Sequence, residues 1–142
     1  MKTLHTITLA LGAIALLGTT TLRAQSAVAN IPFDFAAQRA ALSAGRYELK
    51  SLNPTSDTIQ IINLDTSKSV VVLAPRAMSD PARKDPGSGK VIFHRYGDRY
   101  FFSEVWVPSG LHGRVRISKA EAEVKANSNE KMASVLVPLN GQ

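Results

Sequence analysis

The sequence of 142 residues contains no cysteine. Disulfide bonds, thiolate metal ligands, thiol nucleophiles and a lipid-modified N-terminal cysteine are therefore excluded. A folded domain built from this chain must be held together by the burial of apolar side chains alone. Because small secreted proteins of eukaryotes commonly depend on disulfides, an exported chain without them indicates a bacterial source.

Groups that carry out acid–base or metal chemistry are also scarce. The sequence has three histidines, no HExxH motif and no other closely spaced set of metal ligands. The GSGK segment at 87–90 lacks the first half of a phosphate-binding loop, and no serine lies in the GxSxG motif of a nucleophile turn. The sequence therefore predicts no catalytic residue, no metal site and no cofactor, although paired carboxylates for glycoside hydrolysis could be dispersed among its 11 acidic residues.

Only one long apolar run is present, and it lies near the N-terminus. Lys2 precedes the apolar segment Leu9–Leu17, and small and polar residues follow it up to Ala24, which is typical of a secretory signal peptide. The run is shorter than the roughly 20 residues of a membrane-spanning helix. Cleavage after Ala24 fits this pattern, and the pair of small residues Ala27 and Ala29 offers an alternative site.

Removal of a signal peptide at 1–24 leaves residues 25–142, which suffice for a single β-rich domain and are too few for two. We expect this domain in the periplasm or outside the cell, with no membrane span after processing. The 17 basic residues, less Lys2 and Arg23, face 11 acidic residues, so the net charge falls from +6 to +4. The basic residues are scattered, so the sequence lacks the cluster of basic residues that is typical of a nucleic-acid-binding surface. The positive net charge still allows weak attraction to anionic polysaccharides or lipid head groups.

Short segments rich in Val, Ile, Tyr and Phe recur along the rest of the chain, each bounded by turn-forming residues. This pattern predicts an all-β fold of about seven or eight antiparallel strands. An antiparallel β-sandwich and a small, partly open β-barrel accommodate these strands equally well. The predicted strands lie at 31–35, 45–52, 58–64, 69–75, 91–96, 99–106, 114–117 and 134–139.

Individual strands carry further signals. In the second one, Tyr47 and Leu49 alternate with polar residues, which indicates a strand with one buried face. The continuous apolar run Val70–Leu73 predicts a strand covered on both faces. Pro138 predicts that the last strand lies at an edge or ends there. The segment Pro75–Gly89, with three prolines and two glycines, predicts a long loop, which is either a solvated excursion or a second place for a site.

One helix is predicted, in the segment SKAEAEVKAN near the C-terminus. Ser118 followed by Glu121 forms a capping box, and Asn127 can close the helix. Its apolar side is thin, because only Ala120 and Val124 lie one turn apart. We therefore expect this short α-helix to lie over one end or edge of the sheet.

The densest run of polar and aromatic side chains is VIFHRYGDRYFFSEVW, at 91–106. Gly97 followed by Asp98 predicts a two-residue turn of type II′ and hence a β-hairpin. Counting back from the turn gives opposed pairs, which lie alternately on the two faces. The face that we take as the core face carries Val91, Phe93, Arg95, Tyr100, Phe102, Glu104 and Trp106.

The opposite face of this hairpin would present His94, Tyr96 and Arg99 together. Such an aromatic and cationic patch suits a sugar, an anionic polymer or a protein partner. Alternatively, the same side chains only stabilise the hairpin, at about 0.2–1 kcal/mol for each cross-strand pair. His94 and Asp98 lie on opposite sides of the turn, so they do not align as a catalytic base with its orienting acid.

Two blocks together resemble a known group of proteins. The segment NIPFDFAAQRAALSAGRYEL, at 30–49, is similar to the PFDF…LPAGxY opening of small secreted bacterial β-rich proteins of unknown function. FHRYGDRYFFSEVW, followed by the SKAEAE helix, resembles their second shared block. Ser43 stands where these proteins usually have proline. The resemblance implies export and a β-rich domain, and it implies no catalytic residue.

These observations predict an exported, non-catalytic domain that binds a protein or glycan partner at the cell envelope. One alternative is a hydrolase or isomerase with a dispersed site. Another is a structural matrix component that associates with itself through exposed sheet edges. No pattern in the sequence predicts the oligomeric state.

Overall fold

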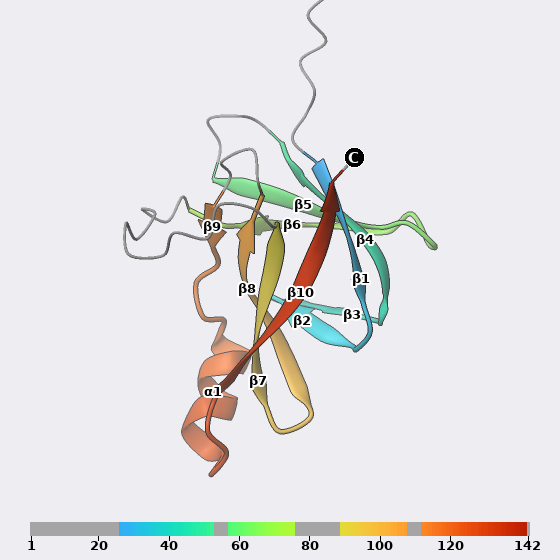
Figure 1. Cartoon of the computed structure of the whole chain (residues 1–142). Helices are drawn as coiled ribbons and strands as arrows, with labels where there is room; N and C mark the ends of the chain where they lie inside the picture. Colours follow the sequence, from blue (N-terminus) through green and yellow to red (C-terminus); the bar gives the residue numbers. More distant parts are fainter. Residues whose placement is uncertain (1–25, 53–56, 76–88, 108–111, 142) are drawn as a thin grey trace, which may run out of the picture.

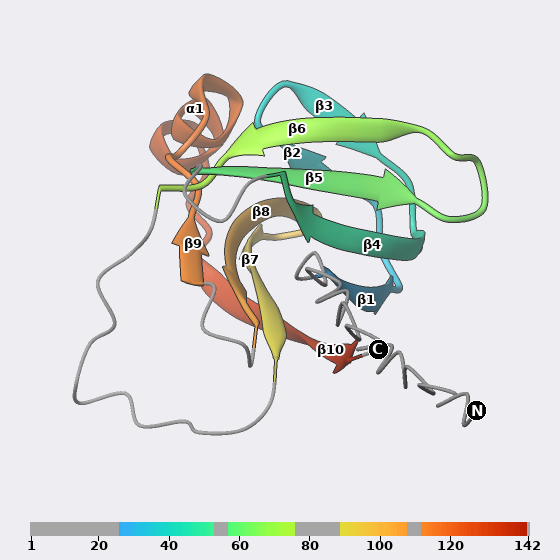
Figure 2. The same cartoon turned by 90° about the horizontal axis from the view of Figure 1, so that it is seen from above.

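The computed structural model describes residues 26–52, 57–75, 89–107 and 112–141. Ten strands form one sheet that curls around a common core into a nearly closed barrel, and one helix lies outside it (Figure 1 and Figure 2). The predicted all-β fold with one short helix is thereby confirmed, and the barrel is the form it takes. The elements are β1 (Ser26–Ile31), β2 (Phe35–Ala37), β3 (Ala40–Leu42), β4 (Gly45–Ser51), β5 (Thr58–Asn63), β6 (Ser69–Leu73), β7 (Lys90–Tyr96), β8 (Arg99–Trp106), β9 (His112–Arg114), α1 (Lys119–Asn127) and β10 (Ala133–Gly141). The predicted signal peptide at 1–24 and residues 76–88 of the predicted loop lie outside the described residues.

The strands follow the order β3-β2-β8-β7-β10-β1-β4-β5-β6, and β9 pairs with β8. All pairs are antiparallel except β2 with β8. The long strand β10 joins the two halves of the barrel, because it pairs first with β7 and then with β1. Pro138 is the last residue of β10 that pairs with β7, and Leu139 is the first that pairs with β1. The prediction that Pro138 marks an edge or a strand end is therefore wrong. A residue without an N–H is tolerated here because β10 changes partner at this point.

The core is formed by the inward face of each strand. Tyr47 and Leu49 are buried as predicted, and their neighbours in β4 are half-buried or exposed. Phe93 lies at the centre, where its ring packs edge-on against Phe35 at 5.2 Å and Phe102 at 5.9 Å between ring centroids. Phe93 is 0% exposed and Phe102 is 3% exposed, so the predicted core face of the hairpin is confirmed at these two positions.

The sheet nearly closes where β9 meets the end of β6. The backbone N–H of Arg114 donates to the carbonyl of Pro75 at 3.1 Å. Gly113 lies so close to Ala74 that an added Cβ would stand 2.9 Å from the carbonyl oxygen of Ala74. The side-chain amide of Gln38 also reaches the carbonyl of Leu73, at 3.5 Å. These contacts hold the two ends of the curled sheet together.

Several predicted strand positions are wrong. A strand at 31–35 does not exist, because β1 ends at Ile31 and the short β2–β3 hairpin begins at Phe35. The predicted strand at 114–117 is found earlier, as β9. The prediction that the 70–73 run is covered on both faces is also wrong. Val71 and Leu73 alternate with the buried Val72 and are 50% and 59% exposed, so one face of β6 is open to solvent.

Candidate functional site

The β7–β8 hairpin has the predicted turn and an unexpected bulge. Gly97 has φ 62°, and Asp98 is not among the residues with positive φ, as a type II′ turn requires. The predicted register holds back to Phe93 and then shifts, so that Ser103 has no opposite partner in β7. Val91 consequently faces Val105, whereas the count back from the turn, without a bulge, places it opposite Glu104; the predicted register is therefore wrong at this end of the hairpin. The bulge turns the apolar Val105 into the core and places the carboxylate of Glu104 on the outer face.

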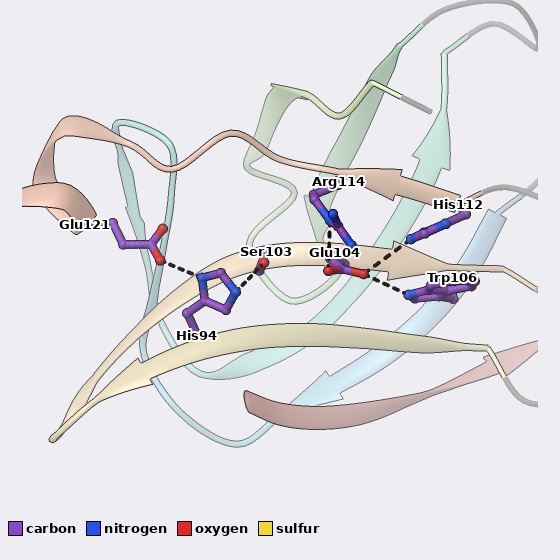
Figure 3. A network of polar contacts seen from close by, with 7 residues as sticks. All are labelled: His94, Ser103, Glu104, Trp106, His112, Arg114 and Glu121. Carbon is purple, nitrogen blue, oxygen red and sulfur yellow. Dashed lines mark hydrogen bonds and ion pairs between the residues drawn. The ribbon is translucent and has the colours of Figure 1, made fainter. Parts of the chain in front are cut away.

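On the outer face of the hairpin, the imidazole of His94 lies between the carboxylate of Glu121, from α1, and the hydroxyl of Ser103 (Figure 3). His94 Nδ1 lies 2.6 Å from Oε1 of Glu121, and His94 Nε2 lies 2.9 Å from Oγ of Ser103. An ionised carboxylate only accepts hydrogen bonds, so Nδ1 carries the proton, and in a neutral ring Nε2 accepts from Ser103. Ser103 and Glu121 are each 3% exposed. This order of groups is that of a serine hydrolase triad, but its hydroxyl is enclosed.

Tyr96 is a second side chain that binds the carboxylate of Glu121. The hydroxyl of Tyr96 donates to Oε1 of Glu121 at 3.2 Å, and the ring of Tyr96 is buried. Burial raises the pKa of Tyr96, and the charge and hydrogen bond of Glu121 raise it further. Ser118 caps α1 as predicted, since its Oγ accepts from the N–H of Glu121 at 3.1 Å. The carboxylate of Glu121 points to the sheet, and α1 therefore covers the outer face of the hairpin through a polar residue.

The predicted patch of His94, Tyr96 and Arg99 is only partly present. His94 and Tyr96 do lie together, but both bind Glu121 under helix α1. The expectation that Tyr96 faces outward is wrong, because it is 4% exposed. Arg99 is exposed, and its guanidinium lies 5.7 Å from the ring centroid of Phe101. A contact role for these residues stays a prediction, and it is now confined to Arg99 and the accessible edge of His94.

A second polar cluster, around Glu104, lies next to the first along β8, towards the Trp106 end of the strand (Figure 3). The carboxylate accepts from Arg114 Nε at 3.0 Å, from Trp106 Nε1 at 3.2 Å, and contacts His112 Nε2 at 3.3 Å. Burial alone raises the pKa of Glu104, but hydrogen bonds from His112, Trp106 and Arg114 and the charge of Arg114 outweigh it and lower this pKa below 4.5. The cluster thus holds β9 against β8 through an ionised acid.

The only tryptophan in the sequence belongs to this cluster. The ring of His112 stacks on Trp106, with 3.3 Å between ring centroids. The ammonium of Lys90 lies 5.9 Å from the centroid of the same tryptophan ring. A sugar that stacks on an aromatic side chain needs an open ring face, and His112 takes up one face of Trp106. The stack of these two rings supports β9 on β8.

The open hollows lie elsewhere on the described surface. One of about 370 Å³ lies between the β2–β3 hairpin and the tip of the β7–β8 hairpin, and one of about 260 Å³ lies between that tip and the end of α1. A groove of about 930 Å³ runs between residues Ala36 to Ala41 and residues Arg116 to Glu123. We call it the β2–α1 groove. Neither His94, Ser103 nor Glu104 lines any of these three hollows.

The β2–α1 groove carries charged side chains that sequence reasoning did not single out. Arg39, Arg116 and Lys119 line it and are exposed, and Glu123 is the single acidic residue among its lining. These residues are far apart in the sequence, and only the β2–β3 hairpin, an element of mostly alanines, brings Arg39 next to the start of α1. No motif signals such an arrangement. Ser103 and Glu121 were likewise not predicted as a site, because the bulge and the position of α1 bring them to His94.

Comparisons of the chain with family models, with curated proteins and with solved structures find no match. Within the described ranges, no helix has the length and apolar character needed to cross a membrane. Among the same residues, no three histidines or carboxylates lie close enough together to hold a metal ion.

Proposed function

We propose that this chain is an exported, non-catalytic β-barrel domain that binds a glycan at or outside the cell envelope. The observation that carries the proposal is that His94, Ser103 and Glu104 lie apart from the three open hollows. The charged lining of the β2–α1 groove is chiefly cationic, from Arg39, Arg116 and Lys119, and Glu123 is its one carboxylate. Such a lining favours binding of a ligand over transfer of a proton.

The two polar networks have a sufficient structural explanation. Glu121 attaches α1 to the sheet by accepting hydrogen bonds from His94 and Tyr96, and Glu104 attaches β9 through Arg114 and Trp106. Buried charged groups of this kind must find partners, because leaving one unpaired is costly. In a domain without disulfides, these networks fasten the elements that the small apolar core does not hold.

A binding assay on a panel of glycans tests this proposal. The full chain, expressed with its own N-terminus and purified from the medium or periplasm, is titrated into neutral and acidic oligosaccharides, and both binding and product formation are measured. We expect saturable binding to at least one glycan without any change in the length of the sugar. Absence of binding across the panel would contradict the proposal, and so would cleavage of the bound sugar.

Export is a separate part of the proposal and is supported by the charge and apolar pattern of residues 1–24. An intact mass measurement on protein recovered outside the cytoplasm tests it. We expect the chain to begin at Gln25 or within a few residues of it. Recovery of a chain that retains Met1 would count against a cleaved signal peptide.

A serine hydrolase is the second candidate, and one observation favours it. Glu121, His94 and Ser103 follow one another at the distances at which a carboxylate orients an imidazole that activates a hydroxyl. Ser103 is only 3% exposed, so an acyl group could reach its hydroxyl only if the residues that cover it moved away. The enclosed hydroxyl is the reason why this function ranks second.

Active-site labelling distinguishes the two candidates. A fluorophosphonate probe forms a covalent bond with a serine that is activated by an imidazole. Labelling of the wild-type chain, together with loss of the label in Ser103→Ala and in His94→Gln, would establish the hydrolase. We expect no label above that of the heat-denatured chain, because the Ser103 hydroxyl is buried. Hydrolysis of p-nitrophenyl acetate, assayed in parallel, is expected to equal that of Ser103→Ala.

A further inference from the structure

We infer that the β2–α1 groove is the binding site and that its ligand is a linear anionic polysaccharide, with carboxylate or sulfate groups along the chain. This inference rests on the proposed glycan-binding function and assigns it both a place and a ligand class. It derives from the charges, the small side chains and the composition of the groove.

The cations of the groove are available to a ligand. Arg39, Arg116 and Lys119 are exposed, and none of them forms an ion pair with any of the residues that the structure describes. By contrast, Arg46 is paired with Asp65 and Arg114 with Glu104. Three cations against the single Glu123 leave the groove with a net charge of +2. An excess of charges of one sign in one groove creates a potential that attracts a ligand of the opposite sign.

The walls between these charges suit a sugar chain. Ala36, Ala40 and Ala41 on one side and Ala120 on the other keep the groove open, because none of them projects beyond a methyl group. Ser118 and Gln38 add uncharged hydrogen-bonding groups at the same surface. Cations that share a groove with such uncharged groups match a polymer that carries both anionic groups and hydroxyls. The volume of about 930 Å³ lies in the range of ligand sites.

Other anionic polymers match the groove less well. Single-stranded nucleic acids are bound by aromatic side chains that stack on the bases, and no aromatic residue lines this groove. Duplex DNA is bound through many clustered cations, whereas here there are three. An acidic peptide or a lipid surface would also meet these cations, and Ile117 is the one large apolar side chain in the lining. These ligands therefore serve as comparisons in the test.

The turn that carries Arg39 is held in an unusual conformation. Gln38 has φ 54°, a left-handed conformation that non-glycine residues adopt rarely. Its side-chain amide is tied to the carbonyl of Leu73 in β6. Arg39 is thus presented from a two-residue turn between paired strands, and the tip of this hairpin also contacts β6. A backbone held in this way leaves less entropy for a ligand to remove.

Charge-neutral variants test the assignment, with oligogalacturonate as the probe and isothermal titration calorimetry as the measurement. The groove variant is Arg39→Gln with Arg116→Gln and Lys119→Gln. The matched control, Lys68→Gln with Arg95→Gln and Lys131→Gln, removes the same charge from exposed cations outside the groove lining. We expect the groove variant to weaken binding at least about tenfold and the control to change it less than about threefold.

Two further measurements sharpen the result. Glu123→Gln removes the one acidic side chain of the groove, so it should tighten binding about two- to fourfold. Dextran of matched length should not bind, and poly-glutamate, single-stranded DNA and phosphatidylglycerol vesicles should bind more weakly than oligogalacturonate.

If wild type binds acidic glycans and the groove variant binds them equally well, the groove assignment is wrong. If any of these other anions binds more tightly, the ligand class is wrong, and if wild type binds no glycan, the proposed function itself fails.

Discussion

His94 Nδ1 lies 2.6 Å from Oε1 of Glu121, and this contact joins the β7–β8 hairpin to a helix that follows it in the sequence. Helices usually pack on a sheet through an apolar stripe. In α1, Ala120 is exposed and Val124 is half-buried, whereas Glu121 is the buried residue of the helix. The attachment of α1 therefore depends on a carboxylate and its two hydrogen-bond donors.

Replacement of Glu121 should detach the helix. In Glu121→Ala, His94 and Tyr96 lose their common acceptor, so we expect the free energy of unfolding to fall by about 3 kcal/mol. Glu121→Gln keeps an acceptor oxygen and should cost about 1 kcal/mol. Urea denaturation gives these values, and hydrogen exchange should show that the amides of α1 lose protection first. Glu123→Ala, an exposed change on the same helix, is the control and should stay within about 0.5 kcal/mol.

Tyr96 is expected to be a structural residue and not a free contact residue. Tyr96→Ala removes a buried ring next to Phe101 and should cost about 3–5 kcal/mol, and Tyr96→Phe, which loses only the hydrogen bond to Glu121, should cost about 1 kcal/mol. Arg99→Ala, on the exposed side of the tip, should cost no more than about 0.5 kcal/mol. Thermal and urea unfolding of the three variants check this order. Equal costs for Tyr96→Ala and Arg99→Ala would contradict the observed burial.

Features set by neighbours in the sequence were predictable. The Gly97 turn, the Ser118 cap and the alternating strand around Tyr47 depend on a few consecutive residues, and all three are present. The bulge at Ser103 was not predictable from neighbouring residues. It is favoured because the shifted register buries the apolar Val105 in the core instead of the charged Glu104. Local pairing rules assume that the ladder continues without interruption.

Features set by the closed sheet were not predictable either. The β2–β3 hairpin consists mainly of alanines, which have low strand propensity, and it exists because β8 and the core provide partners for it. The run at Val70–Leu73 has the composition of a strand covered on both faces. In the barrel only one face of this strand is buried, and Val71 and Leu73 on the other face are exposed. The β2–α1 groove was not predictable for two reasons. Arg39 comes from a hairpin that the sequence did not predict, and Arg116 and Lys119 come from just before and at the start of a helix whose place on the sheet no local pattern specifies.

Gly113, where β9 meets the end of β6, should not tolerate a larger residue without loss of stability. A Cβ there would stand 2.9 Å from the Ala74 carbonyl oxygen, 3.0 Å from the Ala74 Cβ and 3.2 Å from Ile59 Cδ1, and two of these three groups are backbone or short and rigid. We expect Gly113→Ala to lower the free energy of unfolding by about 1–3 kcal/mol through this overpacking. Denaturant unfolding of the single variant, of Ala74→Gly and of their combination measures the coupling. The combined loss should be smaller than the sum of the single losses, because one of the clashes is relieved.

The cluster around Glu104 should make the protein less stable in acid. The pKa of Glu104 is lowered below 4.5 in the folded chain, since hydrogen bonds from His112, Trp106 and Arg114 and the charge of Arg114 outweigh the effect of burial. A lowered folded pKa means that the unfolded chain binds the proton more readily. The contribution of Glu104 to stability is therefore complete above the ordinary value of 4.5 and is lost as the pH falls through the lower, folded value.

A comparison of wild type with Glu104→Gln isolates this contribution from the other carboxylates that titrate in the same range. At pH 7 we expect the variant to be less stable than wild type, because the ionic partner of Arg114 is gone. The difference between the two free energies of unfolding should shrink as the pH is lowered from about 5 towards 3, since wild-type Glu104 then also becomes neutral. Urea denaturation at a series of pH values measures it, and Glu123→Gln should show no such trend. A difference that stays constant down to pH 3, or grows there, would mean that Glu104 is not held ionised by its neighbours.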